Sequence, residues 1–342
     1  MTAPEHASHS AVPATELRSA IQQELRRVLS SHATISHLHR RPSPYRSSFA
    51  LEELDVTLEG GSTLELMIKH TGPDALQEEA RVAKPRLLCD PLREIEVYRG
   101  LLATAPLGTA NYYGSAVDET NGSHWLLVER VRGVELYQVG DLTLWKEASR
   151  WLAKAHARFA ELGPTAASGR LIAHDDAYFR GWIGRASEFA RNGPDVKRRS
   201  IEALAPAYDR AVECLLAVPP TVIHGEFYAS NVLVTRPPDP PRVCPIDWEV
   251  AGFGPGVIDL AALTTGWGGN ARRAMELAYW AALRPPYEWS GSQASFAEAV
   301  DHARLFLAVR WLGWAPWSWT PPVEHRHDWL REARALADRI GA

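Results

Sequence analysis

The sequence has little cysteine, a small net charge and no long hydrophobic run, and each absence excludes a class of protein. Cys89, Cys214 and Cys244 are the only cysteines among 342 residues, and none forms a Cys-x-x-Cys pair. Such scattered thiols argue against a disulfide framework and favour a reducing compartment. A formal net charge of -4 provides no general nucleic-acid footprint. No apolar run approaches the roughly 20 residues of a membrane span.

The first residues also lack the basic and apolar regions of a secretory signal. We therefore expect a cytoplasmic protein that binds neither nucleic acid nor membrane. Residues 1–14 are mostly Ala, Ser, His and Pro, which predicts a disordered start. After them, apolar residues at helical spacing predict an amphipathic helix over 16–30.

The region after this helix is rich in strand-forming residues. Ile35 to Leu38 is interpreted as a short strand, and the Pro and Ser residues of 40–48 predict a loop. Apolar and polar residues alternate on both sides of Gly60-Gly61, so 52–69 is predicted to form a hairpin. A helix over 91–103 and a buried strand over 125–129 follow.

Helical spacing dominates the rest of the chain. A helix is predicted from Asp141 onward, and further helices are predicted at 176–191, 199–217, 257–265, 270–284, 292–312 and 328–340. The change of pattern near Arg132-Gly133 indicates a boundary. The expected fold is α+β with two lobes: a small β-rich N-lobe over 15–132 and a larger, mostly helical C-lobe over 133–342.

One polar turn in the helical part combines residues with catalytic chemistry. Apolar runs at 221–223 and 232–234 flank it, and we interpret them as the strands of a hairpin. The turn and the strand end that follows carry His224, Glu226, Asn231 and Asp247. The amide and carboxylate oxygens are ligands of the kind that Mg²⁺ prefers. The turn is therefore predicted to present one potential base and two metal ligands.

These residues, together with a lysine and a glutamate in the first lobe, resemble a known family. The matching segments are Leu66-Met67-Ile68-Lys69, Glu94, His224-Gly225-Glu226 with Asn231, Ile246-Asp247, and Gly254 to Leu260. Their order resembles the aminoglycoside phosphotransferase and choline kinase-like family, from about Ile35 to Leu263. The resemblance implies the protein-kinase fold and transfer of the γ-phosphoryl group of ATP or GTP to a small-molecule hydroxyl, with Mg²⁺.

The resemblance also implies roles for individual residues. Asn231 and Asp247 would hold the metal, and Glu226 would align the acceptor hydroxyl as the base. Lys69 would bind the α- and β-phosphate oxygens and form an ion pair with Glu94. Glu96 is the competing partner, but the family tends to place its glutamate directly after a basic residue, here Arg93.

The remaining implied roles are structural or concern the purine. His224 and Asp259 would order the catalytic loop, Asp259 by accepting backbone N–H bonds. Glu129 and Val131 lie at the expected inter-lobe linker, where backbone groups would bind adenine. Met67 shares a strand face with Lys69 and is expected to shape the base pocket.

The chain departs from the family pattern at two places. Glu226 replaces the usual aspartate, and its side chain is longer by one methylene, on the order of 1.5 Å. A misplacement of the base near that size can lower the rate by about 10²-fold. Between Ile35 and Leu58 there is no glycine, so Ser47 and Ser48 would have to replace the contacts of a glycine-rich phosphate loop. An enzyme with adapted geometry and a pseudokinase-like protein that holds nucleotide without turnover both remain open.

The sequence does not name the acceptor. An antibiotic, whose phosphorylation would give resistance, stands beside sugar, nucleoside and amino-alcohol metabolites, and the chain is expected to be a monomer or homodimer. The last third is rich in tryptophan and also holds Glu249, Glu324 and Asp328. These acids, with Asp259, and the tryptophan rings would line an acceptor site. The alternative is that most of the rings pack in the core.

Overall fold

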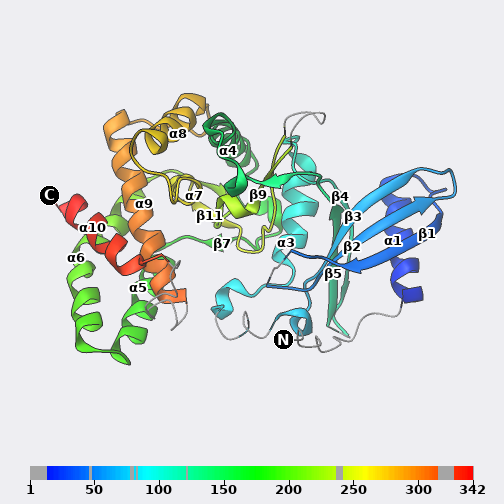
Figure 1. Cartoon of the computed structure of the whole chain (residues 1–342), viewed down its shortest axis with the longest axis horizontal. Helices are drawn as coiled ribbons and strands as arrows, with labels where there is room; N and C mark the ends of the chain where they lie inside the picture. Colours follow the sequence, from blue (N-terminus) through cyan, green and yellow to red (C-terminus); the bar gives the residue numbers. More distant parts are fainter. Residues whose placement is uncertain are drawn as a thin grey trace.

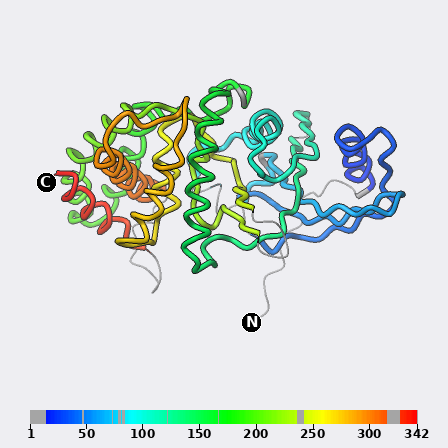
Figure 2. The backbone as a smooth tube through the Cα atoms, turned by 90° about the horizontal axis from the view of Figure 1, so that it is seen from above, coloured from blue at the N-terminus to red at the C-terminus, as the bar shows by residue number. Residues whose placement is uncertain are grey.

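The computed structural model describes residues 14–45, 48–77, 81, 84–120, 122–235, 242–314 and 327–341. It has a sheet-based N-terminal lobe and a helical C-terminal lobe, as expected (Figure 1). The lobes lie side by side, with α1 at one end of the molecule and α10 at the other (Figure 2). The predicted disordered start lies outside the described residues except for Ala14, which is the first residue of α1.

The N-terminal lobe is a five-stranded antiparallel sheet in the order β1-β2-β3-β5-β4. Its strands are β1 (Ile35–Pro42), β2 (Leu51–Leu58), β3 (Thr63–His70), β4 (Tyr112–Asp118) and β5 (Ser123–Glu129). The predicted hairpin over 52–69 is present as β2 and β3. β4 was not predicted.

The loop predicted at 40–48 is wrong for its first residues. β1 continues through Arg40 and Arg41 to Pro42, which is opposite Glu52 in the register with β2. β1 is an edge strand, and proline is tolerated on an edge because its missing N–H is not needed there. Pairing with β2 therefore overrides the local turn preference of the Pro and Ser residues.

The two faces of this sheet differ in their neighbours. α1 (Ala14–Val28) buries Leu17, Ile21 and Leu25 against one face, where Leu66 and Ile68 of β3 also point. Because side chains alternate along a strand, Met67 and Lys69 lie on the opposite face. Both line the cleft described below. The packing of α1 thus decides which face of the sheet is available to a ligand.

A helical segment connects the sheet with the second lobe. It begins as α3 (Arg93–Glu96), continues as a π-helical segment (Val97–Leu101) and ends as a 3-10 turn at Leu102–Thr104. The predicted helix over 91–103 is therefore present with a changing hydrogen-bond pattern, and π-helical turns are frequent at functional sites. Ile95 and Tyr98 are buried in a core that also contains Trp248 of the second lobe.

The C-terminal lobe is built around one large hydrophobic core. Its helices are α4 (Leu142–Leu162), α5 (Asp176–Arg191), α6 (Asp195–Ala217), α7 (Val257–Leu263), α8 (Gly269–Ala282), α9 (Gln293–Trp314) and α10 (Trp329–Gly341). All seven were predicted, although α6 begins four residues earlier than expected. The Asp141 carboxylate caps α4 by accepting a hydrogen bond from the Thr143 N–H at 2.8 Å. Helix α9 is buried on nearly all sides and packs against α5, α6, α7 and α10.

The hairpin predicted between 221–223 and 232–234 is wrong. β8 (Pro220–Ile223) pairs with β11 (Gly252–Pro255), which also pairs with β7 (Ile172–Ala173). β9 (Val232–Val234) instead pairs with β10 (Val243–Pro245) and β6 (Val134–Glu135). The connection over 224–231 therefore joins two separate small sheets, and the polar residues lie between them.

All three cysteines are free thiols. None of the helices in the described part of the chain combines the length and apolar character that a membrane span requires.

Candidate active site

A cleft of about 290 Å³ lies between the two lobes. Its apolar walls are formed by Leu51, Met67, Ala110, Leu126, Val128, Val131, Leu233 and Ile246. Its polar lining includes Lys69, Glu94, Asn231 and Asp247. A slot with apolar walls and a few converging polar groups is the usual form of a small-molecule site. One cavity is therefore lined by seven of the residues that sequence analysis linked to adenine, phosphate and metal: Met67, Lys69, Glu94, Glu129, Val131, Asn231 and Asp247.

The linker between the lobes is held by its own side chains. Glu129 donates its backbone N–H to the Asn111 carbonyl at 2.9 Å, and its carboxylate binds Arg242 at 2.6 and 2.9 Å. Burial raises the pKa of Glu129, but the hydrogen bonds from Arg242 and Asn111 bring it below its usual value. The side chain thus fastens the linker to Arg242 of the second lobe, while Glu129 and Val131 both line the cleft.

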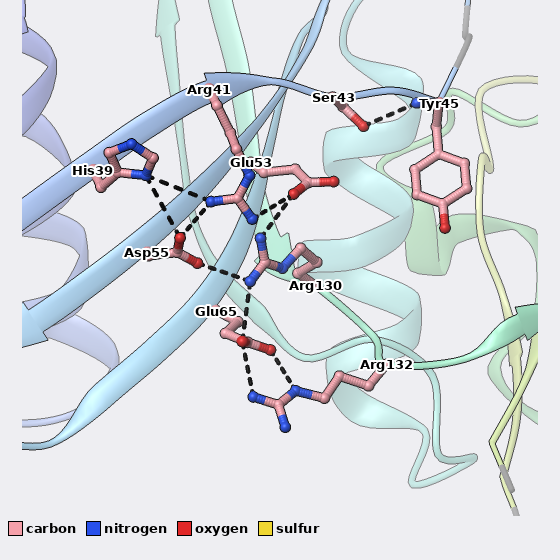
Figure 3. Close-up of polar contacts among 9 residues, drawn as sticks. All are labelled: His39, Arg41, Ser43, Tyr45, Glu53, Asp55, Glu65, Arg130 and Arg132. Carbon is pink, nitrogen blue, oxygen red and sulfur yellow. Dashed lines mark hydrogen bonds and ion pairs between the residues drawn. The ribbon is translucent and has the colours of Figure 1, made fainter.

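The next linker residues are bound to the sheet, as Figure 3 shows. Arg130 binds Glu53 at 2.8 Å and Asp55 at 2.7 Å, both on β2. Arg132 binds Glu65 of β3 at 2.6 Å. These pairs span the cleft-facing side of the sheet, so they fix the linker, and with it the outer edge of the cleft, relative to β2 and β3.

Lys69 lies at the centre of a buried group of charges. Its Nζ is 2.6 Å from Glu94 Oε2, 2.5 Å from Asp247 Oδ1 and 3.5 Å from Glu249 Oε2. The lysine side chain is only 6% exposed. Burial lowers its pKa, but the three carboxylates raise it well above the usual value, so Lys69 is a fixed cation at the polar end of the cleft.

The two glutamates of α3 have different partners. Glu94 contacts Lys69 and uses Oε1 to accept the Trp248 N–H at 3.1 Å. Glu96 instead pairs with Arg99 and accepts the Ser168 hydroxyl at 2.8 Å. The structure therefore places Glu94, and not Glu96, beside the lysine. The contact with Trp248 also couples α3 to the segment that follows Asp247.

Sequence reasoning missed the position of Glu249, which it had grouped with acids of an acceptor wall. Its Oε1 binds Lys84 Nζ at 2.7 Å and accepts the Ser48 hydroxyl at 3.0 Å. Burial raises the pKa of Glu249, but Lys69 and Lys84 lower it to about 2. Ser48 thus donates its hydroxyl to a carboxylate in this structure, and its contact with phosphate stays a prediction. Ser47 lies outside the described residues.

This buried group has more negatively than positively charged side chains. Three carboxylates face two lysines, and burial raises the pKa of Glu94 to about 7 although Lys69 lowers it. Oxygen atoms of Glu94, Asp247 and Glu249 all lie within 4.8 Å of one another. Clustered carboxylate oxygens are the donor set that Mg²⁺ binds, and the excess of negative charge suits a divalent cation. The residues present therefore fit a metal ion beside Lys69.

The backbone of Asp247 is also unusual, with a φ of 65°. Positive φ is uncommon for residues other than glycine, although aspartate tolerates it better than most. Such conformations persist where the surroundings impose them, and they concentrate at functional sites.

The predicted catalytic loop, residues 224–231, is bound by Asp259 of α7. Its carboxylate accepts the His224 N–H at 2.7 Å and the Gly225 N–H at 2.9 Å, and it lies 3.3 Å from His156 Nε2. Burial raises the pKa of Asp259, but His156 and these backbone bonds bring it below the usual value. His224 contacts the Ile246 carbonyl through Nε2 at 2.8 Å, which connects the loop to the residue before Asp247.

The loop requires glycine at position 225. Gly225 has a φ of 81°, and a Cβ at this position would lie 2.5 Å from the carbonyl oxygen of Val250. Both the positive φ and the close backbone exclude a side chain.

Glu226 contacts a residue that sequence analysis did not identify. Its Oε1 is 2.6 Å from Arg310 Nη2 on α9, and its backbone carbonyl accepts the Asn231 amide at 3.0 Å. Burial raises the pKa of Glu226 in spite of Arg310. One signal in the sequence could have identified this arginine: it is a charge inside the apolar run Leu305 to Leu312. A helix that is apolar on all sides is buried, so a charge within it needs a partner of opposite sign.

Part of the tryptophan-rich region lies close to this pair. Trp311, next to Arg310, donates its indole N–H to the Tyr228 hydroxyl at 2.8 Å and stacks on Trp329 at 5.4 Å. Trp267, Trp280 and Trp289 pack against the large core. Asp259 lies beneath the catalytic loop, so it is not an acid of an acceptor wall. Trp317, Trp319 and Glu324 lie outside the described residues.

Comparison with known proteins identifies the family of this chain. The model of a phosphotransferase enzyme family matches residues 55–294, which is more than half of the chain. No curated protein matches the sequence significantly.

Solved structures share the fold at low sequence identity. Choline kinase from Cryptosporidium parvum is 12% identical and has a TM-score of 0.58, with 95% of this chain and 94% of that chain covered. A spectinomycin phosphotransferase in complex with ADP and spectinomycin is 11% identical, with a TM-score of 0.57 and coverage of 97% and 98%. The GDP complex of an aminoglycoside 2'-phosphotransferase is 13% identical, with a TM-score of 0.56 and coverage of 96% and 98%.

These neighbours establish the kinase-like fold, and the family model establishes membership. The chain therefore belongs to the phosphotransferase enzyme family and is a phosphotransferase that acts on a hydroxyl group.

Proposed function

We propose that this protein transfers the γ-phosphoryl group of ATP or GTP to a hydroxyl group of an antibiotic or a related natural product. One observation carries the proposal. A single cleft brings the Lys69–Glu94 pair, Asp247 and Asn231 together. Glu226 lies on the same loop as Asn231, whose side-chain amide donates to the Glu226 carbonyl. This is the set of groups that phosphoryl transfer uses to position phosphates, a metal and an acceptor.

The apolar walls of the cleft suit a purine, and its polar end suits phosphates. Lys69 donates hydrogen bonds to α- and β-phosphate oxygens, while Glu94 keeps the lysine in place. Asp247 and Asn231 would hold Mg²⁺, and carboxylate oxygens of Glu94 and Glu249 lie within 4.8 Å of one of Asp247. The bound ion supplies neutralising charge for the phosphates. Two fold neighbours are complexes with ADP and with GDP, which supports a purine nucleotide as donor.

Glu226 orients the acceptor hydroxyl and receives its proton. The bond between the γ-phosphorus and its bridging oxygen to the β-phosphate breaks, and a new bond forms to the acceptor oxygen. The products are a phosphate monoester and a nucleoside diphosphate. Because the transition state is loose, alignment matters more than base strength. A glutamate can therefore serve if the structure places it correctly.

The acceptor class has more than one candidate. One fold neighbour is a complex with spectinomycin, and others are a choline kinase and an aminoglycoside phosphotransferase. The alternative acceptor is therefore an amino alcohol, a sugar or a nucleoside. A protein that binds nucleotide without turnover is the alternative outside catalysis, motivated by the glutamate at position 226.

One screen tests these alternatives. Purified protein with Mg²⁺ and γ-labelled ATP or GTP is incubated with kanamycin, spectinomycin, erythromycin, choline, ethanolamine, uridine and glucose, and mass spectrometry follows the gain of one phosphoryl group. Phosphorylation of a natural-product antibiotic supports the proposal, whereas tight nucleotide binding without any product would refute it. Glu226→Gln should abolish transfer and leave nucleotide affinity nearly unchanged. Glu188→Gln, on the exposed side of α5, is the matched control.

A further inference from the structure

Arg310 holds the carboxylate of Glu226 from an element far away in the sequence. Its Nη2 is 2.6 Å from Glu226 Oε1, and its Nη1 donates to the Gly225 carbonyl at 2.6 Å. One guanidinium thus binds both the side chain of residue 226 and the backbone just before it. This two-point contact fixes the carboxylate relative to the turn that carries it, as planar guanidinium forks do.

The guanidinium of Arg310 is buried beside two tryptophan rings. The Arg310 side chain is 3% exposed, and its Cζ lies 5.6 Å from the ring of Trp182 and 5.5 Å from that of Trp314. The two rings stack on each other at 6.0 Å with an angle of 5° between their planes. Among the described residues, Glu226 is the only carboxylate within ion-pair distance of Arg310. An unpaired buried charge would cost several kcal/mol, so this arginine requires a carboxylate at position 226.

The length of the glutamate side chain matters for this contact. An aspartate at position 226 would be shorter by one methylene, on the order of 1.5 Å, which would stretch the 2.6 Å contact beyond hydrogen-bond distance. In the described part of the chain, no donor is hydrogen-bonded to Oε2 of Glu226. The arrangement therefore holds one carboxylate oxygen and leaves the other for a ligand.

We propose that Arg310 is a positioning residue that fixes Glu226 through Oε1 and turns Oε2 toward the acceptor hydroxyl, so that glutamate is the base fitted to this site. The inference rests on the proposed function. It resolves the departure from the usual aspartate, because the arginine compensates for the extra reach and flexibility of the longer side chain. Arg310 acts through Glu226 and does not itself contact the reacting atoms.

The test measures kcat and KM for the panel compound that the wild type phosphorylates. Arg310→Met should lower kcat by about 10²-fold, the cost of a misplacement near 1 Å, and leave the nucleotide KM within about twofold. Arg310→Lys should recover only part of kcat, because an ammonium group cannot bridge both acceptors in the same geometry. Glu226→Asp should also lose activity, and adding Arg310→Met to it should cost little more, because the shared contact is already broken.

A matched control separates positioning from folding. Arg304 is buried on the same helix and pairs with Glu276 at 2.7 Å, away from the catalytic loop. Arg304→Lys should lower the unfolding temperature without changing kcat, and Arg310→Lys should be compared with it at equal folded fraction. If Arg310→Met or Arg310→Lys keeps kcat within about threefold of the wild type, or if the effects of Arg310→Met and Glu226→Asp add fully, the inference is overturned and the proposed function stands. A wild type that phosphorylates no panel compound would overturn both.

Discussion

The geometry of the catalytic loop depends on Asp259, and replacing this residue by asparagine tests that dependence. Its two oxygens accept the N–H groups of His224 and Gly225 at 2.7 and 2.9 Å, in a side chain that is fully buried. Asparagine is nearly the same size, so packing changes little. It keeps one acceptor oxygen but turns an NH₂ group toward the second N–H.

The magnitude follows from these contacts. A hydrogen bond to a charged group contributes about 1.5–3 kcal/mol, and an unpaired buried N–H costs about 1–3 kcal/mol. We expect Asp259→Asn to lower the free energy of unfolding by about 3 kcal/mol and the Tm by roughly 5 °C. The loop would move by a fraction of an ångström to about 1 Å, enough to lower kcat by about 10²-fold. The nucleotide KM should change little, since Lys69 and Glu94 lie on β3 and α3.

Calorimetry and steady-state kinetics on the same preparations measure both effects. Asp209→Asn is the control, because that aspartate is 54% exposed and pairs with Arg180 on the surface, where ion pairs contribute less than about 1 kcal/mol. The reasoning would be refuted if Asp259→Asn melted within about 1 °C of the wild type and kept more than half of its kcat.

Two further predictions concern a buried histidine and the purine pocket. Burial, and after it Arg310, lower the pKa of His174 to about 3, although Asp259 opposes them. The unfolded imidazole takes up a proton near pH 6.5, so the folded state loses stability as pH falls from about 6.5 towards 3; between pH 7 and 5 the loss should be about 2 kcal/mol. His174→Phe should remove that part of the pH dependence in urea unfolding, and equal slopes for the two proteins would contradict it. Met67 lines the apolar part of the cleft, and Met67→Ala should change the ratio of kcat/KM for ATP over GTP by up to about tenfold, whereas an unchanged ratio would exclude a role for Met67 in purine choice.

The sequence was informative where function depends on short segments in a fixed order. Alternation on β3 placed Met67 and Lys69 on one face, and helical spacing located all seven helices of the second lobe, because both patterns are local. The fold class followed from the order of strands and helices. The sequence also showed that position 226 carries a glutamate, which raised the question of how a longer base would fit.

Strand pairing could not be read in the same way. The runs at 221–223 and 232–234 look like a hairpin, yet each pairs with a strand elsewhere, β8 with β11 and β9 with β10. A three-residue apolar run carries no information about its partner. Strand pairing depends on which strand edges remain accessible when the surrounding helices pack.

The charged partners were decided only by the tertiary structure. Arg310 lies 84 residues from Glu226, and Glu249 lies 201 residues from Ser48. The sequence identifies a charged side chain but does not identify its oppositely charged partner. The partner is needed because burial has a desolvation cost, and that cost exists only once the chain has packed. The sequence thus determined the chemical groups of this phosphotransferase and their order, while long-range packing decided that Glu226 is held by an arginine and that Lys69 is surrounded by three carboxylates.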